Sequence, residues 1–230
     1  MVGKFFGVVC YADDIILLAP NRTSAQKMLQ VCERFADWNN MKFSTHEDPV
    51  KSKSKAIFVT GLRKNVSLPL PLVLYDKPLP WVKHCDHLGN LITSTGSMDQ
   101  DCRRKRAHFI DGSVKVKESF SFAHPCEVVT AVQKYCTSYH GSSLWRFESD
   151  TVEMINSSWQ TSIKLAWDFP RNCRNYFIDQ ILAPNLTPPA IGLLSKFTNF
   201  YQSLLQSPSP EVEILAAFVL KILEPTQHLT

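Results

Sequence analysis

The sequence predicts an α+β protein whose second half is mainly helical. Five prolines between Pro49 and Pro80 separate short apolar runs of strand length, whereas longer helical patterns dominate from about Met98. Hydrophobic residues make up 44% of the 230 residues and charged residues 20%, a balance typical of a chain that folds around a core. Because Ser, Thr and Gly cluster there, we place the boundary between the two halves near Thr95 to Met98.

The first element is a predicted tight β-hairpin. Apolar, β-branched and aromatic runs occur at Phe5–Tyr11 and Ile15–Leu18, and a three-residue segment joins them. Both runs are so apolar that we expect the arms to be buried, with the turn at the rim of a core. Asp13 and Asp14 end the apolar run that follows Lys4, so we expect neither export nor membrane insertion, and an intracellular location.

Thr23–Asn39 is a predicted amphipathic helix. Thr23 and Gln26 have the spacing of a capping box, and Asn39 and Asn40 suit a left-handed end. One face carries the apolar residues that we expect to be buried, namely Ala25, Met28, Leu29, Cys32, Phe35 and Ala36.

The remaining elements are shorter strands and then helices. Strands are expected at Met41–Ser44, Ala56–Thr60, Val73–Tyr75 and His87–Thr93. The later helical patterns are interrupted near Pro125, Ser149, Pro170, Pro184, Pro188 and Pro208. The closing pattern, Val212–Leu223, predicts a helix that serves as core or docking surface rather than as a membrane anchor.

Charge and cysteine content limit the function classes. The chain has 25 Lys and Arg against 21 Asp and Glu, and the net charge of +4 permits a nucleic-acid partner without requiring one. Only 8 glycines argue against a glycine-rich phosphate loop. The seven cysteines are odd in number and form no CxxC pair, which favours a reducing compartment over a disulfide framework or a zinc finger.

The motif Tyr11-Ala12-Asp13-Asp14 carries the chemistry of the predicted hairpin. Adjacent carboxylates repel unless a cation compensates them, and Mg²⁺ prefers hard oxygen ligands and bridges to substrate phosphates. Two such ions about 4 Å apart support in-line phosphoryl transfer. Asp-Asp is also ordinary turn chemistry, but an apolar strand, Tyr-x-Asp-Asp, a second apolar strand and an amphipathic helix in succession are much rarer.

At these residues the chain resembles a known family. Val9–Pro20 resembles the catalytic hairpin of reverse transcriptases of non-LTR (LINE-type) retrotransposons. Four later segments follow in the family's order: the lysine-bearing palm segment at Lys51–Phe58, the leucine-glycine primer-grip strand at His87–Ile92, the "YGS-LW" thumb element at Tyr139–Trp145 and the tryptophan-to-"LPR" segment at Trp159–Arg171. The likeness spans residues 5 to 207.

The resemblance implies the C-terminal portion of an RNA-directed DNA polymerase. It implies a partial palm in residues 1–96, a helical thumb in 97–147 and a helical C-terminal extension in 148–230. The complete enzyme would use Mg²⁺, an RNA template, a DNA primer and deoxynucleotides, with no membrane and no small-molecule cofactor. Family members carry a further metal-binding aspartate and nucleotide-binding fingers upstream, so we expect this chain, which begins at the hairpin, to be inactive alone.

The resemblance also assigns roles around the catalytic hairpin. Asp13 would be the principal metal ligand and Asp14 its partner, while Tyr11 and Ala12 would shape the floor beside the primer end. Lys53 would face the leaving pyrophosphate as a proton donor or counter-charge. If the register slips, Lys55 takes this role instead of Lys53.

Further residues are expected to hold nucleic acid. Leu88 and Gly89 would hold the primer strand, with glycine allowing close backbone approach. Two basic groups suit phosphate contacts, namely Lys51, Lys53 and Lys55, which a strand would project from one face, and Arg103, Arg104 and Arg106, which open a helical segment. A solvated surface is the simpler interpretation of both groups.

Four alternatives stay open. The chain can be a non-catalytic nucleic-acid-binding remnant of a retrotransposon, or a different two-metal phosphodiesterase, which would need more carboxylates or histidines near the pair. A zinc cluster of His84, Cys85, His87 and Cys102 fits no usual zinc spacing, so packing and surface roles are favoured. Core packing is likewise favoured over base stacking for Trp145, Trp159 and Trp167.

Overall fold

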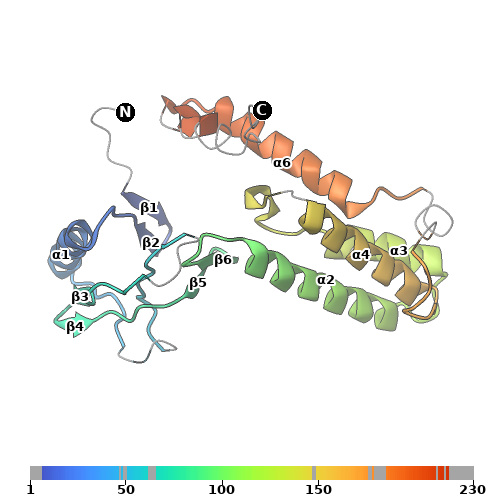
Figure 1. The fold of residues 1–230 in the computed structure, drawn as a ribbon, viewed down its shortest axis with the longest axis horizontal. Helices are drawn as coiled ribbons and strands as arrows, with labels where there is room; N and C mark the ends of the chain where they lie inside the picture. Colours follow the sequence, from blue (N-terminus) through green and yellow to red (C-terminus); the bar gives the residue numbers. More distant parts are fainter. Residues whose placement is uncertain are drawn as a thin grey trace. The chain divides into compact units, whose positions relative to one another are not determined.

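The protein has an α+β fold, which confirms the predicted class (Figure 1). The computed structural model describes residues 7–46, 48, 51–61, 66–146, 149–175, 178, 185–210, 212–214 and 216–217. The chain divides into two compact units, of which the first comprises Met1–Asp86 with Ile92–Ser97 and the second His87–Leu91 with Met98–Thr230. The boundary between the units at Ser97 and Met98 lies in the segment Thr95 to Met98, where the sequence changes from short runs of strand length to longer helical patterns.

The first unit opens with the predicted hairpin. Strands β1 (Val8–Tyr11) and β2 (Asp14–Leu17) pair antiparallel, with Val8 opposite Leu17 and Tyr11 opposite Asp14. This register leaves residues 12 and 13 as a two-residue turn. The start of the first predicted arm, residues 5 and 6, lies outside the described residues.

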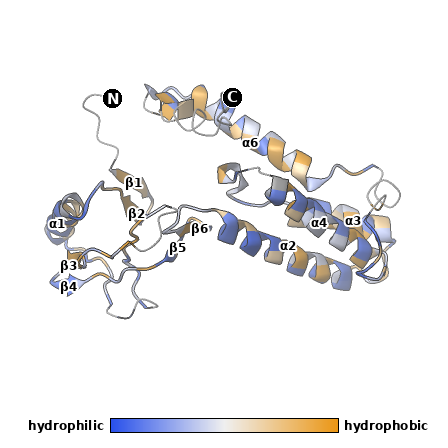
Figure 2. Cartoon of the chain, viewed as in Figure 1, coloured by the Kyte–Doolittle hydropathy of each residue, from blue (hydrophilic) through white to orange (hydrophobic). Residues whose placement is uncertain are grey.

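The expectation that the hairpin arms are buried is wrong. Val8, Val9 and Ile15 are 46%, 49% and 42% exposed, although the hydropathy colouring in Figure 2 shows the apolar character of both strands. The two strands form a sheet of their own among the described residues. Apolar content predicts burial only where another layer of structure covers the strand, and a lone hairpin has none.

The helix α1 (Arg22–Trp38) begins one residue earlier than predicted and uses a different cap. Asn21 is the N-cap, and its side chain accepts a 2.9 Å hydrogen bond from the Ser24 amide. The capping box expected at Gln26 is wrong, because its side-chain amide instead exchanges two 2.8 Å hydrogen bonds with the backbone of Val73. At the other end Asn40 has φ +54°, the left-handed conformation expected there.

The buried face of α1 is narrower than predicted. Ala36 is 1% exposed, and Ala25 and Leu29 pack against the small core of the first unit. Phe35, expected on this face, is 53% exposed and contradicts the prediction. The core of the first unit reaches only one side of the helix, and its buried members are Ala56, Leu72, Leu74 and Leu79.

Strand structure is sparse in the rest of the first unit. Strands β3 (Val73–Leu74) and β4 (Lys77–Pro78) form a small hairpin. The strands predicted at Met41–Ser44 and Ala56–Thr60 are absent from these described residues, apart from one isolated bridge between Ala56 and Trp81. Apolar runs of this length do not distinguish a strand from an extended loop unless a partner strand is present.

The strand predicted at His87–Thr93 is a hairpin instead. Strands β5 (His84–His87) and β6 (Asn90–Thr93) pair with each other, and Leu88 and Gly89 form the turn between them. Their φ angles of +48° and +76° match a type I′ turn, in which both central residues are left-handed. The tip of this hairpin, His87–Leu91, belongs to the second unit.

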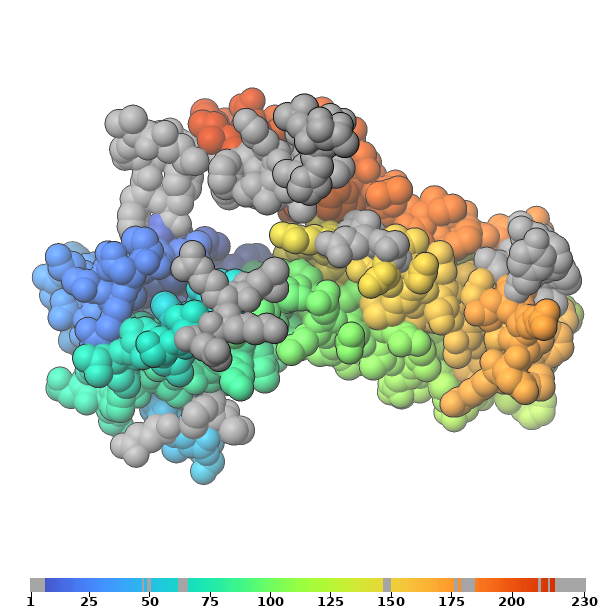
Figure 3. Space-filling view, in the orientation of Figure 1, coloured from blue at the N-terminus to red at the C-terminus, as the bar shows by residue number. Residues whose placement is uncertain are grey.

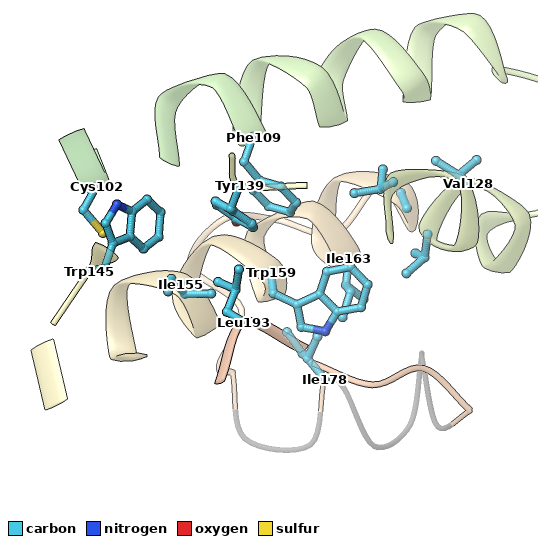
Figure 4. Packing of buried hydrophobic residues seen from close by; sticks show 13 residues of the cluster. Cys102, Phe109, Val128, Tyr139, Trp145, Ile155, Trp159, Ile163, Ile178 and Leu193 are labelled. Atoms are coloured by element: carbon cyan, nitrogen blue, oxygen red, sulfur yellow. The ribbon is translucent and has the colours of Figure 1, made fainter. Parts of the chain in front are cut away.

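The second unit is built from helices around one core. Its elements are α2 (Asp99–Ser119), α3 (Pro125–Cys136), the 3-10 helix η1 (Ser142–Leu144), α4 (Ser149–Ala166) and α6 (Pro189–Leu205). Helix α2 packs against both α3 and α4, and its green atoms adjoin the yellow atoms of α4 in Figure 3. The core role favoured for Trp145 and Trp159 is confirmed, since they are 2% and 1% exposed (Figure 4). Trp167 packs against the same core.

None of the helices in the described part of the chain combines the length and the hydrophobicity that a transmembrane span requires. Of the closing helix predicted at Val212–Leu223, residues 212–214 and 216–217 are helical. The other residues of that prediction lie outside the described part of the chain.

The small core of the first unit gives a first testable prediction. Leu74 is 2% exposed, so Leu74→Ala removes buried methyl groups and should lower the free energy of unfolding by about 2–5 kcal/mol. Leu70 is 73% exposed, so Leu70→Ala should stay within roughly 0.5 kcal/mol of the parent chain. Urea unfolding followed by hydrogen exchange of first-unit peptides checks both values, and equal effects would contradict this assignment of the core.

Candidate functional site

The turn of the first hairpin has a constrained backbone. Ala12 has φ +52°, a left-handed conformation that costs a residue other than glycine roughly 1–2 kcal/mol. Asp13, the second turn residue, is not at positive φ, so the turn has the φ pattern of type II′ rather than of type I′, and this type matches the right-handed twist of the flanking strands. The turn therefore places Asp13 at the tip and Asp14 as the first residue of β2.

Both carboxylates are exposed to solvent, as the motif predicts. Tyr11 beside them is 66% exposed. Within the described residues, the side chains of Asp13 and Asp14 make no hydrogen bond or ion pair. Two hard oxygen donors with free access fit Mg²⁺, which is commonly held by one or two carboxylates together with waters and substrate phosphates.

The geometry of the described residues gives no support to the zinc alternative, which the sequence spacing already disfavours. Within the described residues, no group of three or more His, Cys, Asp and Glu side chains is placed to hold a metal ion. This applies to the set His84, Cys85, His87 and Cys102. Burial raises the pKa of the Cys102 thiol to about 12, with the nearby Asp101 and Asp99 adding to the shift, so this side chain is a neutral member of the core.

The predicted lysine group lies in irregular structure. Residues 51–55 form a turn and bends rather than a strand, so strand alternation does not place the three lysines on one face. Lys51, Lys53 and Lys55 are nevertheless all exposed, whereas the side chain of Ser52 is buried and donates a 2.6 Å hydrogen bond to the Ser54 carbonyl. No described contact joins Lys53 to the aspartates of the hairpin turn.

The Leu88–Gly89 turn is surrounded by basic side chains of the second unit. Lys105 Nζ donates to the Gly89 carbonyl at 2.6 Å, and Arg104 Nη2 donates to the same oxygen at 3.2 Å. His140 Nε2 lies 3.1 Å from the Leu88 carbonyl oxygen, which requires the proton on Nε2. Two segments that the sequence singled out separately, the leucine-glycine turn and the Tyr139–Trp145 element, are therefore in contact.

The buried carboxylate of Asp101 stabilises the contact between the Leu88–Gly89 turn and the Tyr139–Trp145 element. Asp101 is 1% exposed, and its Oδ1 accepts hydrogen bonds from the Leu91 amide at 3.1 Å and from Arg104 Nη2 at 3.0 Å. Its Oδ2 accepts a 3.1 Å bond from the Trp145 indole. Asp101 is not among the residues that the sequence predicts for the site, and its only sequence signal is its position three residues before an arginine of the basic run.

Close packing at Gly141 joins the same two segments. Gly141 has φ +78°, and a Cβ atom there would lie 1.7 Å from Asn90 Oδ1.

No protein-family model, characterised protein or solved structure matches this chain.

The neighbouring Tyr139 is a core residue. Its ring stacks on Phe109 with centroids 5.6 Å apart and meets Trp145 edge to face at 5.9 Å. Figure 4 shows Tyr139 beside Phe109 in the core. Burial raises the pKa of its hydroxyl well above the usual value, so the side chain stays neutral. Tyr139 thus anchors the segment that presents His140.

The predicted arginine run divides into different roles. Arg103 is exposed and accessible to a partner. Arg106 Nε donates a 2.9 Å hydrogen bond to Ser158 Oγ, whose residue is fully buried. Arg104 is half-buried and donates hydrogen bonds to Asp101 and to the Gly89 carbonyl, so two of the three arginines are bonded to other residues of the chain.

Asp101 provides the second prediction. Asp101→Ala leaves the Leu91 amide, the Trp145 indole and Arg104 without their shared acceptor, and should lower the free energy of unfolding by about 3–5 kcal/mol. The matched control is Asp111→Ala on the same helix, which removes an exposed pair with Lys115 and should change stability little. Thermal and urea unfolding measure both, and a mild effect of Asp101→Ala would refute its role as the clamp.

Gly141 provides the third prediction. Gly141→Ala should cost more than the roughly 1–2 kcal/mol of a left-handed alanine, because the new methyl group meets Asn90. Adding Asn90→Ala should remove the steric contribution to this destabilisation. A double-mutant cycle should then give a coupling free energy of about 0.5–3 kcal/mol. Strictly additive effects would show that the two segments do not pack as described.

Proposed function

We propose that this chain is the C-terminal portion of an RNA-directed DNA polymerase, the reverse transcriptase of a non-LTR retrotransposon. In the complete protein it would take part in two-metal nucleotidyl transfer on an RNA template and a DNA primer. The observation that carries the proposal is the exposed hairpin turn of Tyr11-Ala12-Asp13-Asp14, in which two strands hold adjacent carboxylates open to solvent.

The donor chemistry of the turn supports this reaction class. Adjacent carboxylates without a bonding partner in the described chain repel each other, so they favour a bound cation. Bound Mg²⁺ would supply electrostatic stabilisation of the attacking and leaving oxygens. In this proposal Asp13 and Asp14 hold the metal, and Tyr11 and Ala12 lie beside the primer end.

The basic residues have complementary roles in the proposal. Exposed Lys53 would offset the charge of the leaving pyrophosphate, and Lys51 and Lys55 would contact the nucleic-acid backbone. Leu88 and Gly89 would contact the primer strand. The left-handed Gly89 supports this role, since a residue without a side chain lets another backbone approach closely.

The finer architecture belongs to the same proposal. Residues 1–96 would be the end of a palm, 97–147 a thumb and 148–230 a C-terminal extension. The exposed apolar arms of the first hairpin are compatible with this assignment, because exposed apolar surface is typical of a face that another part of a protein covers. We expect the rest of the palm to cover it in the complete polymerase.

Metal mapping at the hairpin tests the proposal and is the fourth prediction. Titration with Mn²⁺, a paramagnetic substitute for Mg²⁺, should broaden the backbone NMR signals of residues 11–14 before those of other turns. Asp13→Asn removes one charged ligand and should weaken this binding by about tenfold or more, since affinity follows the ligand charge count. Excess Mg²⁺ should reverse the broadening.

Asp76→Asn is the matched control. Asp76 is a single exposed aspartate with φ +58° in the turn between β3 and β4, so it shares turn position and charge without a neighbouring carboxylate. Its removal should leave the broadening at residues 11–14 unchanged. Equal Mn²⁺ broadening in the parent chain and in Asp13→Asn would overturn the metal assignment and favour the non-catalytic remnant. In a longer polymerase that contains this chain, full primer extension by Asp13→Asn would do the same.

A further inference from the structure

Three basic side chains converge on one turn of the second unit. Arg104 and Lys105 come from α2, and His140 comes from the segment before η1. All three are bonded to the carbonyl oxygens of Leu88 and Gly89, at distances from 2.6 to 3.2 Å. Such a concentration of basic groups at exposed hydrogen bonds creates a local positive potential.

The positive charge is only partly compensated. Asp101 offsets Arg104, with 3.0 Å between Oδ1 and Nη2, and both oxygens of Asp101 already accept hydrogen bonds. Lys105 is bonded to a carbonyl, and within the described residues it has no carboxylate at ion-pair distance. A positive charge therefore remains beside the turn.

Hydrogen-bonding capacity also remains at the turn. Lys105 carries three N–H groups and uses one of them on the Gly89 carbonyl. His140 is exposed, and its second ring nitrogen makes no hydrogen bond to the described part of the chain. When the imidazole is protonated, that nitrogen becomes a donor as well. These groups suit an anion with several acceptor oxygens, and phosphate has that chemistry.

We propose that Arg104, Lys105 and His140 form a phosphate-binding site at the Leu88–Gly89 turn, and that its ligand is the sugar-phosphate backbone of a nucleic-acid strand. The inference rests on the proposed function for its choice of ligand. It adds His140 and Lys105, which the sequence did not assign. It leaves out Arg106, which is bonded to the buried Ser158.

Glycine at position 89 matters to the site for a reason beyond its φ angle. A Cβ atom there would lie 3.3 Å from His140 Cδ2, so any side chain would crowd the imidazole. The turn thus keeps the histidine in place and leaves its outer face open. The simpler interpretation is that the three basic groups only clamp the turn, and the experiment must separate these two roles.

The fifth prediction uses the double variant Lys105→Gln/His140→Gln in the full chain. Arg104 is kept, because its removal would leave Asp101 without its counter-charge. Binding of a fluorescein-labelled primer-template duplex is followed by anisotropy across a chloride titration in EDTA. The slope of log affinity against log salt should flatten by about 0.9, because one phosphate is no longer neutralised, and every sequence should bind more weakly.

Lys134→Gln is the matched control. Lys134 is an exposed lysine of α3, and its replacement removes the same formal charge away from the turn, so the slope should equal that of the parent chain. Thermal unfolding of all variants checks that they are folded. An unchanged slope in the double variant, or an equal change in Lys134→Gln, would reject the phosphate-binding site. The three basic groups would then only hold the Leu88–Gly89 turn in place.

Two further outcomes identify the ligand and separate the two proposals. Displacement of the duplex by inorganic phosphate at matched ionic strength would mean that the site takes free phosphate, and would overturn the nucleic-acid assignment. Because EDTA removes divalent metal, the result does not depend on the hairpin aspartates. Absence of Mn²⁺ binding at the hairpin together with the expected slope effect would reject the polymerase and retain the phosphate site.

Discussion

The buried carboxylate of Asp101 is the constraint on which the geometry of the second unit depends. Taking a charge out of water costs several kcal/mol, so a buried aspartate persists only where donors surround it. Its donors are the Leu91 amide, Arg104 and the Trp145 indole, which come from three separate parts of the chain. One side chain therefore fixes the hairpin tip, the start of α2 and the end of η1 against one another.

This clamp has a consequence for surface chemistry. With the hairpin tip fixed, the carbonyls of Leu88 and Gly89 face the basic groups of Lys105 and His140. Gly141 permits the approach, since a side chain there would strike Asn90. Stability and binding potential at this turn thus come from the same interactions, and substitutions must be chosen to separate them.

The first unit is organised differently. Among the described residues, the core cluster of the first unit has four buried members, whereas that of the second unit has thirteen. The first hairpin, which belongs to the first unit, exposes apolar side chains such as Val9. Residues 12–14 are held by strand pairing and by turn geometry rather than by a packed surrounding. The carboxylates at this turn are open to solvent, and under the proposed function metal and substrate would complete the order of the site.

The sequence by itself determined the local structure. The hairpin at residues 8–17 and the left-handed end of α1 at Asn40 follow from backbone sterics and from neighbours in the chain. Only the tertiary structure decided that Leu88 and Gly89 form a turn, that the arms of the first hairpin are exposed and that Arg106 points inward. A side chain's burial and partners depend on residues far along the chain, and Ser158, the partner of Arg106, is 52 positions away. No local pattern encodes such a contact, because it exists only after the helices pack.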